Sequence, residues 1–274
     1  GVSSAASDVY KRQFWGRLGN LGTRLGFMEL VPYGAVLGVV VLLVVKEPHM
    51  SGTILIMVGA AAVLFAAGIN IVWFIAGIGS VGALMTFIIL NTTYMTARVQ
   101  LWLDPWSDEA NTGYQMVQSL MSIGSGGLTG LPWGQGSGKF FYLPEAHTDF
   151  AFAIFCQEWG LLGAAILISV FLLLAAAFFR IAVNTKDERG FILVSGVSLL
   201  IVGQAVANMA MVCGLLPVIG VPLSFISYGG TSMLITLASI GLVLSVYRDE
   251  CKREKLERLS PDTRRTQMLS LIHI

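Results

Sequence analysis

The sequence predicts an all-α membrane protein that crosses the bilayer several times, and three observations lead to this fold class. Hydrophobic residues make up 55% of the 274 residues. Charged residues make up only 12%, whereas soluble chains carry about 25%. The mean hydropathy is +0.75, and the apolar residues gather in long blocks instead of recurring at helix or strand period. An ordinary soluble domain is therefore excluded.

Six apolar blocks are each long enough, with interfacial residues at their ends, to cross a hydrocarbon core of about 30 Å. They lie at 30–46, 53–69, 72–90, 150–180, 191–213 and 232–247. Residues 1–13 and about the last six residues resemble translated adapter sequence, so both are treated as non-native. We expect a membrane domain over 14–250 and a cytoplasmic tail over 251–274. The three cysteines are far apart and predict no disulfide framework.

The distribution of basic residues predicts the orientation in the membrane. Without the suspect Lys11 and Arg12, twelve of fifteen Lys and Arg residues fall on one side of the six spans. The three on the other side are Lys46, Arg98 and Lys139. Because cytoplasmic loops are enriched in Lys and Arg, the first side is cytoplasmic. The long loop 91–149 and the loop 214–231 are then extracytoplasmic, and the tail after 247 is cytoplasmic.

The extracytoplasmic loop 91–149 has 59 residues and is too rich in Trp, Leu and Met for a solvated spacer. Its stretch GYQMVQSLMSIG predicts a short helix at the membrane interface. The glycine-rich stretches at 124–130 and 134–139 lack the spacing of a phosphate-binding loop, and no nucleic-acid partner is expected.

Acid–base residues stand directly before the fourth span, in the stretch YLPEAHTDF that ends at Phe150. Glu145, His147 and Asp149 bring three titratable groups to the membrane surface, which suggests acid–base chemistry. The alternative is that Thr148 or Asp149 only caps the helix that follows, since both residue types are favoured caps. His147 has no second histidine nearby and by itself is no metal site.

Glu158 lies nine residues after Asp149, about 13 Å along a straight helix, which predicts a position inside the bilayer. An acid there needs a partner, for which Arg98 and Lys46 are the candidates. A structural ion pair and a substrate role are both open.

Polar residues in the fifth span and turn-forming residues after it predict how this part of the chain packs. Gln204 and Asn208 are four residues apart on one helical face, which predicts hydrogen bonds between helices. The loop 214–230 is rich in Gly and Pro, which favours a re-entrant or tightly turned segment. Ser227 and Tyr228 are the candidate contacts in the pocket that such a loop would shape.

Several ordered motifs resemble the SEDS proteins, the FtsW/RodA/SpoVE family of peptidoglycan polymerases, over about residues 30 to 250. They are YLPEAHTDF, Gln157-Glu158-Trp159-Gly160, Asp104-Pro105-Trp106, Gly113-Tyr114-Gln115, Gly124-Ser125-Gly126-Gly127, and Leu216-Pro217 through Ser227-Tyr228-Gly229-Gly230. Ala146 before the histidine and the motifs LDPW and GYQ are similar to the sequences of the FtsW/SpoVE branch. The family often has Glu-Glu where this chain has Gln157-Glu158, which suggests that only Glu158 matters in that pair.

The resemblance implies ten spans, of which the six here are the last six, and a glycosyltransferase that joins lipid II units on the outer face of the bacterial cytoplasmic membrane. It implies Asp149 as the general base and Glu145 as a second functional acid. For the departing undecaprenyl diphosphate we expect Lys139 or Arg98 as the cation. The candidate substrate contacts are His147, Thr148, Glu158, Ser227 and Tyr228. A divalent cation held by Glu145 and Asp149 stays an open alternative.

The partners that the resemblance implies are an undecaprenyl-diphosphate-linked glycan, a class B penicillin-binding protein with transpeptidase activity, and proteins of the division machinery. Two other functions stay open. A flippase or transporter of a lipid-linked substrate fits the polar residues within spans, but it needs no base at the membrane surface. A noncatalytic scaffold of the division complex is the second alternative.

Overall fold

The computed structural model describes residues 93–108, 113–132, 136, 147–218 and 220–257, together with short stretches between 34 and 86. The elements in order are α5 (Thr93–Leu103), the 3-10 helix η1 (Pro105–Asp108), α6 (Tyr114–Gly126), α7 (Ala151–Asn184), α8 (Glu188–Val212) and α9 (Gly230–Glu257). All regular elements of these described ranges are helices, which confirms the predicted all-α class. The predicted spans 30–46, 53–69 and 72–90 lie largely outside the described residues.

Among the described residues, three helices, α7, α8 and α9, are long and apolar enough to cross a membrane, and they match the last three predicted spans. They are longer than the apolar blocks, because the helices continue into polar residues at their ends. The predicted cytoplasmic loop 181–190 shrinks to 185–187. Asp187 ends this loop as the N-cap of α8, and its Oδ2 accepts a hydrogen bond from the Gly190 amide at 3.0 Å.

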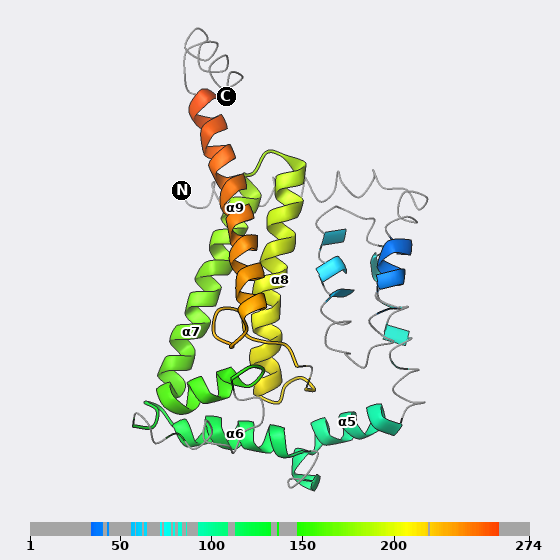
Figure 1. Cartoon of the computed structure of the whole chain (residues 1–274), viewed down its shortest axis with the longest axis vertical. Coiled ribbons are helices and arrows are strands. Elements are labelled where there is room, and N and C mark those ends of the chain that lie inside the picture. The colour runs from blue at the N-terminus through cyan, green and yellow to red at the C-terminus, as the bar shows by residue number, and fades with distance from the viewer. Residues whose placement is uncertain are drawn as a thin grey trace, which may run out of the picture.

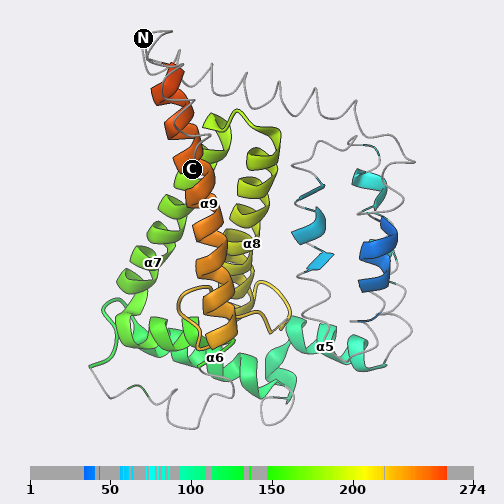
Figure 2. The ribbon, with the colours of Figure 1, turned by 45° about the horizontal axis from the view of Figure 1, so that its top comes forward.

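The three long helices stand side by side, and α6 runs across one end of them (Figure 1). The yellow and orange loop 213–229 folds at this same end, whereas the loop 185–187 and the last turns of α9 lie at the other, as the tilted view also shows (Figure 2). Following the distribution of basic residues, we call the end with α6 the outer end and the end with the loop 185–187 the inner end. The predicted helix within the long loop is confirmed as α6.

Two apolar clusters hold the long helices together, one toward each end. The outer cluster joins Phe150, Leu167 and Met211 to Leu223 of the loop. The inner cluster joins residues of all three helices, namely Phe178, Ala182, Phe191, Val194, Ile201 and Val243. Only 6% of the most apolar stretch of α9 is buried, against 33% in α8. Most of α9 therefore presents apolar side chains outward, as a helix in lipid does.

The charged end of α9 departs from its predicted role in one respect. The mixed charges of DECKREKLERL predict a solvated cytoplasmic helix or a contact with anionic lipids. Residues 251–255 are exposed. Glu250, however, is 8% exposed, and its Oε1 accepts a hydrogen bond from the Lys186 amide at 2.9 Å. This contact joins α9 to the loop between α7 and α8.

Candidate active site

A kink at Gly160 divides α7 into two parts. Gly160 has φ 64° and ψ −166°, a conformation that side chains with a Cβ rarely adopt. The turns before it lie across the outer end beside α6, and the rest of the helix rises from there (Figure 1). The prediction that Glu158 lies 13 Å up a straight helix is therefore wrong, because Glu158 belongs to the crosswise turns. Its side chain is half-buried.

Backbone groups released by the kink bond to the turn that follows α6. The amides of Leu161 and Leu162 donate to the carbonyls of Gly127 and Leu128, at 2.9 and 3.1 Å. In return, the amide of Leu131 donates to the carbonyl of Gln157 at 3.0 Å. The kink thus keeps its polar groups satisfied and locks two segments together.

Close contact between these two segments explains the glycine-rich stretch at 124–130. A Cβ at Gly126 or Gly130 would collide with the backbone of α7, at Cys156 and Glu158 respectively. A Cβ at Gly160 would collide with the backbone of Leu128 and Gly130. These glycines therefore have a packing role.

Gln157 reinforces this joint and was missed by the sequence analysis, which favoured Glu158 in that pair. Its side chain is 2% exposed, and its Nε2 donates to the Ser125 hydroxyl at 3.0 Å. Gly136 lies against the same side chain. The signal for Gln157 was only its position beside Glu158.

The start of α7 places Asp149 just outside the helix. The N-cap residue is Phe150, whose side chain makes no capping hydrogen bond. Neither Thr148 nor Asp149 takes the N-cap position, so the capping alternative is wrong in that form. Both side chains are half-buried, and His147 is exposed.

Three carbonyls in a row before α7 are held by α8 and by the segment that follows it. The His147 carbonyl accepts from the Tyr228 amide at 2.7 Å, and the Thr148 carbonyl accepts from the Ser227 hydroxyl at 2.5 Å. The Asp149 carbonyl accepts from Nδ2 of Asn208 at 2.7 Å. We call these three bonds the carbonyl clamp. They fix the main chain of 147–149 and leave its side chains at the outer end.

The clamp depends on the loop 213–229, which turns back into the outer cluster at Leu223 and which we call the re-entrant loop. Its glycines and prolines predict a re-entrant or tightly turned segment. Leu223 is buried in the outer cluster, and its amide donates to Ser227 Oγ at 2.7 Å. Phe225 adopts φ 69°, a strained value for a residue with a side chain. Nε2 of Gln204 holds the loop by donating to the Pro222 carbonyl at 2.9 Å.

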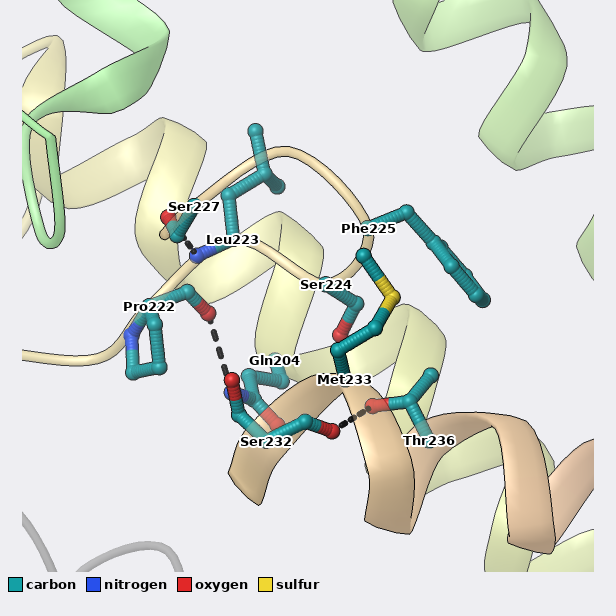
Figure 3. A pocket seen from close by; sticks show the side chains of 9 residues that line it. All are labelled: Gln204, Pro222, Leu223, Ser224, Phe225, Ser227, Ser232, Met233 and Thr236. Carbon is teal, nitrogen blue, oxygen red and sulfur yellow. Dashed lines mark hydrogen bonds between the residues drawn. The ribbon is translucent and has the colours of Figure 1, made fainter. Parts of the chain in front are cut away.

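A small pocket lies between this loop and the first turns of α9 (Figure 3). The polar side chains of Gln204 and Ser227 that line it are already bonded to the loop backbone. Gln204 and Asn208 therefore form hydrogen bonds as predicted, but their partners are loop carbonyls and not another helix.

The remaining predicted residues differ in how the structure places them. Ser227 is 6% exposed and acts within the clamp, whereas Tyr228 is 81% exposed beside His147. Glu145, Lys139 and Lys46 lie outside the described residues, as does the side chain of Arg98, whose backbone belongs to α5. Within the described part of the chain, no three His, Cys, Asp or Glu side chains come together as a metal site would require.

Chemically, the outer end offers a half-buried carboxylate on a main chain that hydrogen bonds hold in place. Partial removal from water suits a carboxylate to act as a base toward a hydroxyl group. A fixed main chain suits it to a reaction that needs precise positioning. This pairing makes Asp149 the centre of the candidate site.

Comparisons with known proteins identify the family. Residues 20–252 match the FtsW/RodA/SpoVE family, which is described as "Cell cycle protein". A probable peptidoglycan glycosyltransferase FtsW of Geobacter sp. strain M18 is 38% identical over 216 residues, which cover 78% of this chain and 59% of the relative. The FtsW relative of Marinobacter nauticus is 37% identical over 247 residues, covering 89% of this chain and 60% of its own.

Solved structures show the same relationship. A structure reported for a peptidoglycan synthase complex that coordinates polymerization and crosslinking aligns with a TM-score of 0.68 and 27% identity, over 87% of this chain and 68% of its own. The rod shape determining protein RodA of Thermus thermophilus aligns with a TM-score of 0.55 and 25% identity, over 87% and 63%. The chain spans about three-fifths of the length of the curated relatives described above. On the match over residues 20–252 and on these relatives, the chain belongs to the FtsW/RodA/SpoVE family of multi-pass membrane proteins.

Proposed function

We propose that this protein is a peptidoglycan glycosyltransferase that joins lipid II units into glycan strands on the outer face of the bacterial cytoplasmic membrane. The observation that carries the proposal is the position of Asp149, half-buried at the outer end and held by the carbonyl clamp. Family membership and the names of the relatives support the same activity.

The proposed reaction is a single displacement. Asp149 accepts the proton of the attacking sugar hydroxyl, whose oxygen forms a bond to the anomeric carbon of the donor sugar. The bond from that carbon to undecaprenyl diphosphate breaks, and the diphosphate leaves with the electron pair. One displacement inverts the anomeric configuration, so one carboxylate is sufficient.

The departing diphosphate carries negative charge that nearby cations can stabilise, so the reaction needs cations more than a general acid. We assign this role to Lys139 or Arg98, the two basic residues of the loop 91–149. Glu145 is assigned to tuning Asp149 or binding the acceptor sugar, and His147, Thr148, Glu158 and Tyr228 to contacts with the substrate. A divalent cation held by Glu145 and Asp149 is the alternative for the diphosphate, and a chelator that stops the reaction would favour it.

The partners follow from the proposed product. A new glycan strand must be crosslinked, so we propose a class B penicillin-binding protein with transpeptidase activity as the partner, in the context of the division machinery. The related peptidoglycan synthase complex, which couples polymerization to crosslinking, supports this pairing.

The test is polymerisation of purified lipid II by the full-length protein in a defined membrane system, with the partner transpeptidase present. The wild type should make glycan strands, and Asp149→Asn should lose activity by about 10² or more, the usual contribution of a general base. Asp187→Asn is the matched control, because it changes another aspartate that precedes a long helix. Movement of lipid II across the membrane without polymer would instead identify a flippase. If neither polymerisation nor movement is observed, the noncatalytic scaffold is the remaining alternative.

A further inference from the structure

We infer that Asn208 is a positioning residue that orients the Asp149 carboxylate through the main chain. This inference rests on the proposed function, since it concerns the same reaction. Asn208 lies on α8, 59 residues away in sequence from the aspartate whose carbonyl it holds. It was not among the candidate site residues that the sequence predicted, because spacing indicated only hydrogen bonds between helices.

The amide of Asn208 joins three segments at one point. Its side chain is fully buried, and Nδ2 donates both to the Asp149 carbonyl at 2.7 Å and to the Val221 carbonyl at 2.5 Å. The opposite amide orientation would set Oδ1 against two carbonyl oxygens, so these partners define which atom is the nitrogen. One side chain thus ties α8 to the start of α7 and to the re-entrant loop.

The other half of this amide carries a cost. Oδ1 is buried and has no hydrogen-bond partner among the described residues. A buried acceptor without a donor is costly, and an apolar side chain of similar shape would avoid that cost. What an apolar side chain cannot supply is the pair of N–H groups that hold the two carbonyls.

Gln204 provides a matched comparison one turn earlier on the same face of α8. Its Nε2 holds the Pro222 carbonyl of the re-entrant loop at 2.9 Å. Both residues therefore secure this loop from the same helix. Of these two residues, Asn208 also donates to the segment before α7, at the Asp149 carbonyl. A substitution at Gln204 therefore loosens the loop. A substitution at Asn208 loosens the loop and also releases the Asp149 carbonyl.

The expected effect is on the chemical step. The Asp149 carboxylate is attached to the peptide unit that Asn208 holds, so release of the carbonyl lets the carboxylate shift. A misplacement of about 1 Å costs on the order of 10²-fold in rate. We expect Asn208→Leu to lower kcat about tenfold to a hundredfold and to leave KM for lipid II within about twofold, because Asn208 is not placed to touch the substrate. Gln204→Met loosens the re-entrant loop but keeps the bond to the Asp149 carbonyl, so its loss of kcat should be smaller, about threefold, with KM within about twofold.

The experiment measures kcat and KM for lipid II with the full-length wild type, Asn208→Leu, Gln204→Met, Asp149→Asn and the double variant Asn208→Leu/Asp149→Asn. If Asn208 acts through Asp149, the double variant is no slower than Asp149→Asn, since the base it positions is already gone. Multiplication of the two losses, or equal losses for Asn208→Leu and Gln204→Met, overturns the inference. A rise in KM with unchanged kcat overturns it as well.

Hydrogen exchange separates this inference from the proposed function. Amides of residues 148–154 should exchange faster in Asn208→Leu and stay as in the wild type in Gln204→Met. If the wild type makes no glycan, the proposed function fails, and exchange alone decides. Unchanged exchange in Asn208→Leu overturns the inference, whereas faster exchange in that variant only supports Asn208 as the residue that holds this segment.

Discussion

The starts of α7 and α8 look alike in sequence and differ in structure. Each has an aspartate shortly before a long apolar helix, Asp149 at the outer end and Asp187 at the inner end. Asp187 is the N-cap of α8, and its carboxylate accepts from the Gly190 amide. Asp149 precedes the N-cap Phe150, and it is held through its carbonyl by Asn208.

This difference shows that the fold uses the same residue type in two ways, through the side chain at one end and through the main chain at the other. At the inner end the side chain of Asp187 supports the helix, so its geometry follows from that helix. At the outer end, residues from distant segments support the main chain of Asp149, so its side chain is positioned by the fold. Hydrogen bonds from elsewhere in the chain are what a catalytic carboxylate needs to stay in place.

The largest effect should come from Gly160→Ala, compared with Gly190→Ala. The first adds a Cβ at φ 64° and against the backbone of Gly130 and Leu128, which cannot move aside cheaply. Strain and overpacking together should cost about 3 kcal/mol or more. At Gly190 the nearest neighbours of the new Cβ are side-chain atoms of Thr185, Val246 and Asp187, at 2.8, 3.0 and 3.8 Å.

Yield and thermal unfolding of the two variants in detergent measure this prediction. The close side-chain contacts at Gly190 oppose the substitution, but alanine favours the helix over glycine by about 1 kcal/mol. Because this gain offsets part of the cost, Gly190→Ala should lose about 1 kcal/mol of stability at most. Equal stability of the two variants would mean that the kink does not lock the start of α7.

A smaller effect tests the inner aspartate. Asp187→Ala should cost about 1 kcal/mol in the free energy of unfolding, whereas Asp187→Asn should cost a few tenths, since Asn caps helices about as well as Asp. Both should keep normal polymerisation per folded molecule. Chemical denaturation in detergent measures the stability. A loss of activity in Asp187→Asn at normal stability would contradict the division of roles between the two aspartates.

Labelling perturbs the protein least and tests whether the two ends lie on opposite sides of the membrane. Cys213 at the outer end and Cys251 at the inner end are both exposed, whereas Cys156 is buried. In intact cells, a membrane-impermeant maleimide should modify Cys213, and Cys251 only after permeabilisation. The reverse accessibility would invert the orientation.

Much of the framework was predictable from the sequence. Hydropathy located α7, α8 and α9, and the pattern GYQMVQSLMSIG located α6, because lipid and interface impose strong composition rules. The motif around Asp149 identified the candidate base. The Gly and Pro content of 214–230 indicated the re-entrant loop.

Contacts between distant segments were not predictable. A glycine within an apolar helix is common, so nothing local showed that Gly160 would break α7 and place Glu158 in the crosswise turns. Spacing put Gln204 and Asn208 on one face, but it could not show that Asn208 reaches the Asp149 carbonyl. Ser227 was expected to contact substrate, and only the fold revealed its bond to the Thr148 carbonyl.

The most direct test of the central claim compares Asn and Ala at position 149 in the full-length protein. Lipid II polymerisation, normalised to folded protein, and lipid II binding are measured for both variants. Asn cannot accept the proton but keeps the shape, so the account predicts a loss of about 10² or more for Asn and Ala alike, with normal yield and binding. Near-normal polymerisation by Asp149→Asn, with reduced yield for Asp149→Ala, would contradict it and make Asp149 a structural residue like Asp187.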